Sequence, residues 1–233
     1  MSLVVAMQVR NDDVVIAADR RGTFGDPRGL VALDECVCKL IPFGGNAALG
    51  IVGMPSAVLE PIDAAIAQFA ANPGQDRVAV LHQHLHDYYK RHFGIRPFVA
   101  NAPVQDSRPQ VNITYVDRRP SGKGIYSLPS EVNFTPLPIG RPYALAGVSQ
   151  YALYLYQRLW RADLTATEAA HLASLLITET SKLDPKVGPE PDVLILKADG
   201  ISRLEKKEVD GILKKNDKRI ADLAASFKDG RAR

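Results

Sequence analysis

The chain has 233 residues, of which 46% are apolar and 24% are charged, with 17 glycines and 16 prolines. These proportions exclude a collagen, a coiled coil and a disordered chain, and they fit one globular domain that buries a core without disulfide or metal staples. The formal net charge of +3 at pH 7 is too small to indicate a nucleic-acid partner bound through its phosphates. We therefore expect a single domain over residues 1–233.

Cysteine content and apolar run length favour a cytoplasmic protein. Cys36 and Cys38 are one residue apart, which in a strand places both thiols on one face and disfavours a bridge between them. Such free thiols are typical of a reducing compartment. No apolar run approaches the roughly 20 residues of a membrane helix, and the N-terminus lacks the pattern of a signal peptide. We expect no membrane partner.

The first half of the chain predicts strands followed by two helices. Two apolar stretches, Leu3 to Val9 and Val14 to Ala18, are separated by polar residues and predict a buried hairpin. The glycine-rich stretch from Gly22 to Gly29 predicts a loop. Strand patterns and then apolar residues at helical spacing follow, with strands expected at 37–41 and 47–52 and helices at 56–71 and 78–92.

The second half repeats this order and ends in a helix. Strands are expected at 110–116, 124–128, 143–146, 192–197 and 201–204, with helices at 150–160, 165–182 and about 208–227. Hairpins, and not long crossovers, link most of the strands. This order favours two antiparallel sheets with layers of helices outside them.

The residue after the initiator methionine is a possible nucleophile. A small second residue permits removal of Met1, and a mature chain would then begin with Ser2, which carries both a hydroxyl and a free α-amine. Such a pair is a nucleophile with its own base. Serine is common at this position, so the assignment depends on the residues that accompany it.

Five further segments accompany Ser2 in order and spacing. The apolar strand from Val14 ends in Asp19-Arg20-Arg21, and the others are Cys38 to Phe43, Leu49 to Gly53, Ala146 to Ser149, and Ser181 to Asp184 with the strand at 192–196. Over about residues 2–205 the sequence resembles the proteasome β-subunit family of N-terminal nucleophile hydrolases, with a pattern similar to its bacterial branches HslV, Anbu and the β-proteobacterial homologue. The resemblance implies a four-layer αββα sandwich.

The resemblance also implies roles for particular residues. Ser2 would be the nucleophile, and Lys39 would hold a positive charge that favours the free amine and ionisation of the hydroxyl. Asp19 would pair with Lys39, because a buried lysine without a partner tends to lose its charge. The backbone N–H of Gly53 would donate to the developing oxyanion.

Two other residues would orient the amine and a water molecule, namely Ser149 and Asp184. The match around Ser149 is offset, because Val148 stands where the family pattern places the serine. The nucleophile departs as well, since most of the family has threonine, whose methyl group restricts its rotamer.

The activity implied is that of a threonine-type endopeptidase with serine as nucleophile and no cofactor. The resemblance further implies homo-oligomeric rings of six or seven subunits, two of them stacked, that degrade unfolded proteins or peptides with an AAA+ unfoldase as a possible partner. Two alternatives stay open. One is a ring-forming homologue without peptidase activity, and the other is an amidase of the same fold that acts on a small substrate.

For two further patterns, a histidine pair and the charged C-terminal helix, we prefer a structural interpretation to a functional one. His82 and His86 are four residues apart, a spacing that could hold zinc, but the segment lacks the glutamate of a metalloprotease helix and no third ligand is evident. We expect a polar helix face and no metal. The charged C-terminal helix predicts a solvated face over an apolar stripe that packs on the domain, and contact with a neighbouring subunit or an ATPase is the alternative.

Overall fold

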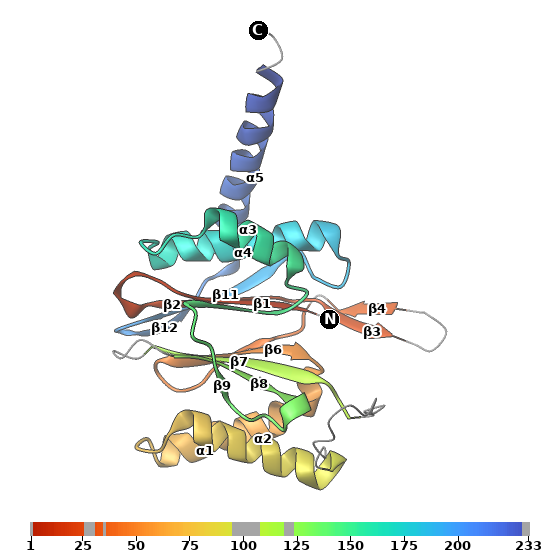
Figure 1. The fold of residues 1–233 in the computed structure, drawn as a ribbon, viewed down its shortest axis with the longest axis vertical. Coiled ribbons are helices and arrows are strands. Elements are labelled where there is room, and N and C mark those ends of the chain that lie inside the picture. The colour runs from red at the N-terminus through yellow and green to blue at the C-terminus, as the bar shows by residue number, and fades with distance from the viewer. Residues whose placement is uncertain (1, 26–30, 35, 95–107, 119–123, 230–233) are drawn as a thin grey trace.

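The computed structural model describes residues 2–25, 31–34, 36–94, 108–118 and 124–229. Two five-stranded antiparallel sheets pack face to face, and each is covered on its outer side by a pair of helices. Figure 1 shows the resulting order of layers, with α3 and α4 on one side, the two sheets in the middle and α1 and α2 on the other side. The expected αββα sandwich is therefore confirmed.

The first sheet contains the N-terminal strand between two other strands. Its strand order is β10-β1-β2-β11-β12, with β1 Leu3–Gln8, β2 Val14–Asp19, β10 Tyr143–Gly147, β11 Pro191–Lys197 and β12 Gly200–Arg203. Every residue of β2 is buried, because helices cover one face of this sheet and the second sheet covers the other. This double burial explains why the two N-terminal strands are almost continuously apolar.

The second sheet lies between the first sheet and a helix pair. Its order is β5-β6-β7-β8-β9, with β5 Leu40–Pro42, β6 Ala47–Gly53, β7 Val111–Asp117, β8 Ile125–Pro129 and β9 Leu137–Pro138. Helices α1 (Leu59–Ala71) and α2 (Arg77–Phe93) cover it. The short 3-10 turns of the described chain are Arg10–Asp12, Pro55–Ala57 and Ser130–Val132.

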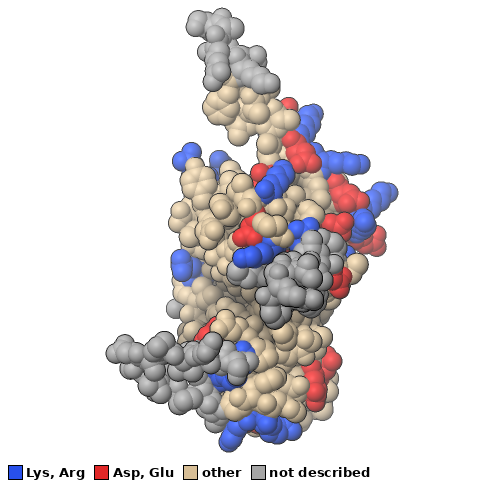
Figure 2. All heavy atoms as spheres, turned by 90° about the vertical axis from the view of Figure 1, so that its right-hand side faces the viewer, with Lys and Arg blue, Asp and Glu red and all other residues tan. Residues whose placement is uncertain are grey.

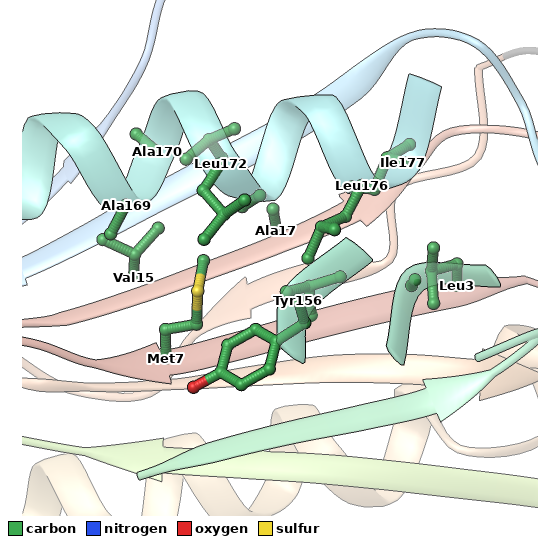
Figure 3. Close-up of a cluster of buried hydrophobic side chains, with 14 of the residues drawn as sticks. Leu3, Met7, Val15, Ala17, Tyr156, Ala169, Ala170, Leu172, Leu176 and Ile177 are labelled. Carbon is green, nitrogen blue, oxygen red and sulfur yellow. The ribbon is translucent and has the colours of Figure 1, made fainter. Parts of the chain in front are cut away.

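Helices α3 (Gln150–Leu159) and α4 (Ala166–Leu183) cover the first sheet. A capping box begins α4, because the Thr165 side chain accepts from the backbone N–H of Glu168 while the Glu168 carboxylate accepts from the backbone N–H of Thr165. Figure 3 shows side chains of α4 and of Tyr156 from α3 packed against β1, which carries Leu3 and Met7, and against β2. This core fixes the chain immediately after Ser2.

The last helix, α5 (Lys206–Asp229), packs on the domain only at its start. Val209, Ile212 and Asn216 are buried, and the Asn216 side-chain amide donates to the carbonyl oxygen of His171 on α4 at 3.0 Å. Farther along, Leu223 is 59% exposed and Phe227 is 71% exposed. Figure 1 shows this second half projecting away from the α3–α4 layer, so the expectation that the whole stripe packs on the domain is wrong.

The region expected as a glycine-rich loop is also different in the structure. Gly22–Gly25 forms strand β3, which pairs antiparallel with β4 (Val31–Asp34) in a separate hairpin beside the sandwich. The rest of that expected loop lies outside the described residues. Main-chain pairing with a partner strand here outweighs the weak strand propensity of glycine. The following strand begins at Leu40 and not at residue 37.

The two thiols do not lie on a common strand face. Cys36 is in a turn and Cys38 is in irregular chain; both are exposed and free. Among the described residues, no helix is long and apolar enough to cross a membrane.

One glycine sets the separation of the two sheets where β6 crosses β1 and β2. A Cβ on Gly50 would lie 2.6 Å from Cγ1 of Val4 and 3.1 Å from Cδ1 of Ile16. We predict that Gly50→Ala lowers the free energy of unfolding by about 1–3 kcal/mol, because the added methyl overpacks the core. Equilibrium urea unfolding at a fixed protein concentration measures this change.

Gly45 provides the matched control, because a Cβ there meets nothing within 4 Å. The Gly45→Ala variant should unfold within about 0.5 kcal/mol of the wild type. Equal stability of the two variants would contradict the role assigned to Gly50.

Candidate active site

A buried carboxylate at the end of β2 organises the site. Asp19 is fully buried, and its Oδ1 accepts the backbone N–H of Leu3 at 2.8 Å. Its Oδ2 accepts Nζ of Lys39 at 2.8 Å, the N–H of Gly188 at 2.9 Å and the N–H of Arg21 at 3.1 Å. Hydrogen bonds of this kind stabilise the ionised form of a carboxylate. The side chain therefore joins four separate pieces of backbone and side chain at one point.

Lys39 precedes β5 and points into the same space. Its side chain is 2% exposed, and besides the ion pair with Asp19 its Nζ donates to the carbonyl oxygen of Arg21 at 2.6 Å. A buried ammonium is tolerated only where a counter-charge and hydrogen bonds replace the lost water. Asp19 and the Arg21 carbonyl supply both. The structure thus brings together the aspartate and the lysine that the sequence analysis paired.

Ser2 stands directly before β1 and is 3% exposed. Its carbonyl oxygen accepts the backbone N–H of Val148 at 2.9 Å. The neighbouring Gly147 has φ +87°, and a Cβ there would lie 1.8 Å from the Ser2 carbonyl oxygen. Only glycine combines that backbone conformation with so close an approach. The end of β10 therefore holds the Ser2 backbone from one side, while Asp19 holds the N–H of the next residue from another.

Gly53 ends β6 at the same edge of the sandwich. Its φ is +107°, and a Cβ there would lie 2.1 Å from the carbonyl oxygen of Gln110, so the turn also requires glycine. The preceding residue, Val52, reaches the Ser2 region, because a Cβ on Gly147 would lie 3.2 Å from its Cγ1. Val52, the residue before Gly53, therefore lies close to Gly147, which in turn approaches the Ser2 carbonyl oxygen.

Ser149 and Asp184 lie at helix ends, and the contacts described for them are with nearby residues of the chain. Ser149 is the N-cap residue of α3, but its side chain makes no capping hydrogen bond. Asp184 follows α4, and its Oδ1 accepts the N–H of Lys186 at 2.9 Å while its carbonyl oxygen accepts the N–H of Val187 at 3.1 Å. Asp184 therefore shapes the turn that delivers the N–H of Gly188 to Asp19.

Three contributors to this site were not singled out from the sequence. The N–H groups of Val148 and Gly188 act through the main chain, which residue type does not reveal. Arg21 also clamps the turn after α4, because its Nη1 donates to the carbonyl oxygen of Pro185 at 2.8 Å. The charged sequence Asp19-Arg20-Arg21 is visible at the end of the apolar strand, but the sequence does not indicate that Arg21 contacts the turn after α4.

No group of three or more His, Cys, Asp or Glu residues that could hold a metal ion occurs within the described ranges. The rings of His82 and His86 are 5.8 Å apart between centroids. Burial, and then the neighbouring His86, lower the pKa of His82 below its usual value. Nε2 of His84 instead lies 2.8 Å from Oε1 of Gln68.

Comparison with known proteins finds similarity in three-dimensional structure but none in sequence. No family model matches the chain, and no curated protein matches it in sequence. Among solved structures, the chain is similar to the Anbu (Gly-1) mutant from Hyphomicrobium sp. strain MC1, with a TM-score of 0.69 and 16% identity, covering 98% of this chain and 97% of that one. It is also similar to Anbu (ancestral beta-subunit) from Yersinia bercovieri, with a TM-score of 0.70, 15% identity and coverage of 97% and 96%.

The chain has the Anbu fold. The likeness covers nearly the whole of both chains, so it includes both sheets and the helix pairs outside them. This is the proteasome-type fold of N-terminal nucleophile hydrolases, as the sequence resemblance implied.

The buried ion pair yields a prediction about stability. Asp19→Asn removes the counter-charge of Lys39 and should lower the free energy of unfolding by about 3–5 kcal/mol, because a buried charge is left without its partner. Replacing Lys39 as well, as in Asp19→Asn with Lys39→Met, should recover a large part of that loss, because no buried charge is then left unpaired and the amide oxygen at position 19 still accepts a backbone N–H. Urea unfolding of the three proteins provides the comparison. A double variant no more stable than Asp19→Asn would contradict this account of the pair.

Proposed function

We propose that the protein is a peptidase whose nucleophile is the hydroxyl of Ser2 after removal of Met1. The observation that supports this most strongly is the Asp19 carboxylate, which binds both the N–H of Leu3, next to Ser2, and the ammonium of Lys39. A fixed positive charge is thereby held beside the start of the chain. The similarity of the fold to N-terminal nucleophile hydrolases supports a hydrolase at the coarse level.

In the first step the α-amine of Ser2, as the free base, accepts the hydroxyl proton while Oγ attacks the carbonyl carbon of a peptide bond. The Lys39 charge lowers the free energy of the developing alkoxide. The backbone N–H of Gly53 donates to the oxyanion of the tetrahedral intermediate. When the intermediate collapses, the C–N bond breaks and the α-ammonium returns its proton to the leaving amine, which leaves an acyl ester on Ser2.

In the second step water attacks the ester. The same α-amine takes the proton of the water, and the proton passes to Oγ of Ser2 as the C–O bond breaks. A carboxylic acid leaves and the N-terminal serine is regenerated. We assign Ser149 and Asp184 as the groups that orient the amine and this water. The hydrogen bond from the N–H of Lys186 holds the Asp184 carboxylate within its turn.

The proposed assembly is two stacked rings of six or seven copies each in the cytoplasm, enclosing the active sites. Unfolded proteins or peptides would be the substrates, and an AAA+ unfoldase would feed them. The fold similarity to a β-subunit homologue supports ring-like oligomers.

The lysine provides the sharpest test of the mechanism. We predict that Lys39→Ala lowers the rate of hydrolysis of a fluorogenic peptide at least about 100-fold, because the alkoxide loses its charge partner. The variant should still fold, because Asp19 keeps its three backbone donors, although loss of the counter-charge lowers the free energy of unfolding as in Asp19→Asn. The exposed Lys197 is the matched control, and Lys197→Ala should retain wild-type rates. Unchanged rates in Lys39→Ala would exclude this mechanism.

The nucleophile is tested by one exchange that removes the hydroxyl and one that keeps it. We predict that Ser2→Ala is inactive, because no atom remains to carry the acyl group. Ser2→Thr should retain or increase activity, because the extra methyl restricts the rotamer of the nucleophile. Steady-state peptidase assays on purified proteins, with intact mass to verify removal of Met1, measure both.

Three outcomes would contradict the proposal. Activity in Ser2→Ala would place the nucleophile elsewhere. Cleavage of small amides but no peptides would favour the amidase. A processed wild-type chain that assembles but cleaves neither would favour the scaffold.

A further inference from the structure

A small pocket lies between the β11–β12 edge of the first sheet and the first turns of α5. Its volume is about 130 Å³, and Arg20, which follows β2, completes its lining. Figure 2 shows charged side chains of both signs side by side along α5, the helix that forms one wall of the pocket. The pocket therefore combines a confined space with charge.

Apolar side chains form part of the lining and limit what can bind. Pro191 and Val209 are buried, and Leu204 and Leu213 are partly buried. Removing water from such a surface favours an apolar group on the ligand. The volume is well below the roughly 300 Å³ at which pockets for drug-sized ligands begin. We therefore expect a ligand of amino-acid size.

Charged side chains form the rest of the lining, namely Arg20, Glu190, Asp192, Arg203, Lys206 and Asp210. Two of them pair with each other, since Nη1 of Arg203 lies 3.3 Å from Oδ2 of Asp192. The other four form no ion pair with another described residue. Two cations and two anions thus line one pocket without neutralising one another.

Each wall of the pocket carries one charge of each sign. Arg20 and Glu190 belong to the wall formed by the sheet, and Lys206 and Asp210 lie one helical turn apart on α5. A simple anion or a simple cation would meet a like charge on either wall. A zwitterion can contact a cation of one wall and an anion of the other, so the arrangement favours a ligand that carries both charges.

We propose that this pocket binds an α-amino acid with an apolar side chain. The carboxylate contacts Arg20, because a guanidinium can donate two parallel hydrogen bonds to a carboxylate. The ammonium contacts Asp210 on the opposite wall, and the side chain packs on the apolar part of the lining. The inference concerns binding and does not rest on peptidase activity.

The pocket adjoins the segments that hold the buried ion pair. Pro191, in its lining, stands opposite Asp19 in the pairing of β2 with β11. Arg203 donates from Nη2 to the carbonyl oxygen of Leu40 at 2.8 Å, directly after Lys39. An occupant of the pocket therefore contacts the chain beside both members of the pair.

The first test varies the ligand and leaves the protein unchanged. Isothermal titration calorimetry of the full chain with L-leucine should give a Kd of about 1 mM or lower. N-acetyl-leucine lacks the ammonium and leucine amide lacks the carboxylate, so each should bind at least about tenfold more weakly. Equal affinity for leucine and for either derivative would overturn the proposal, as would the absence of leucine binding.

The second test removes one charge from each wall. Arg20→Gln with Asp210→Asn should raise the Kd for leucine at least about tenfold, because both charged ends of the ligand lose their partners. The matched control is Arg219→Gln with Asp222→Asn, since these two exposed residues of α5 lie outside the pocket. Both variants keep the net charge of the wild type, and circular dichroism verifies folding. The control should keep the wild-type Kd, and an unchanged Kd in the pocket variant or an equal rise in both variants would overturn the proposal.

Thermal unfolding gives a separate readout on the same proteins. Leucine should raise the Tm of the wild type and of the control, because a ligand that binds only the folded state stabilises it. It should leave the Tm of the pocket variant unchanged. An equal rise in all three proteins would show an effect of the solute without this pocket and would overturn the proposal.

Discussion

The Asp19 carboxylate is the constraint on which the candidate site depends. It receives the N–H that follows Ser2, the N–H groups of Arg21 and Gly188, and the ammonium of Lys39. A carboxylate with so many donors is held in one orientation. The start of the chain, the end of β2, the turn after α4 and the segment before β5 are therefore located relative to one another by a single side chain.

The sandwich makes this arrangement possible by burying the N-terminal strand on both faces. β1 lies between β10 and β2, and its residues are covered by α4 on one side and by the second sheet on the other. Gly147 then allows the end of β10 to meet the Ser2 carbonyl, which a side chain would prevent. A chain terminus is usually mobile. Here the core and these main-chain contacts hold Ser2 and β1 in place, which the proposed role of Ser2 requires.

The sequence predicted the layers of helices and sheets because the spacing of apolar residues indicates which faces of a helix or strand are buried. The continuous apolar character of Leu3–Gln8 and Val14–Asp19 reflects two covered faces, and the helices of both layers followed from apolar spacing. The pairing of Asp19 with Lys39 came from the resemblance to the proteasome β-subunit family, and the general need of a buried lysine for a counter-charge supported it. The N–H groups of Val148 and Gly188 could not be found this way, because any residue supplies a main-chain donor. The β3–β4 hairpin was missed because the glycines of the segment indicated a loop and residue type did not reveal the main-chain pairing with the next strand. The unpacked half of α5 was missed because an apolar stripe does not reveal what covers it.

The most direct test of the central claim is the intact mass of the purified protein before and after incubation with a peptide epoxyketone, which reacts with a hydroxyl and its neighbouring α-amine together. The account predicts that Met1 is absent, that a single adduct forms on the wild type and that none forms on Ser2→Ala. A chain that lacks Met1, is folded and takes no adduct would contradict the assignment of Ser2 as an N-terminal nucleophile.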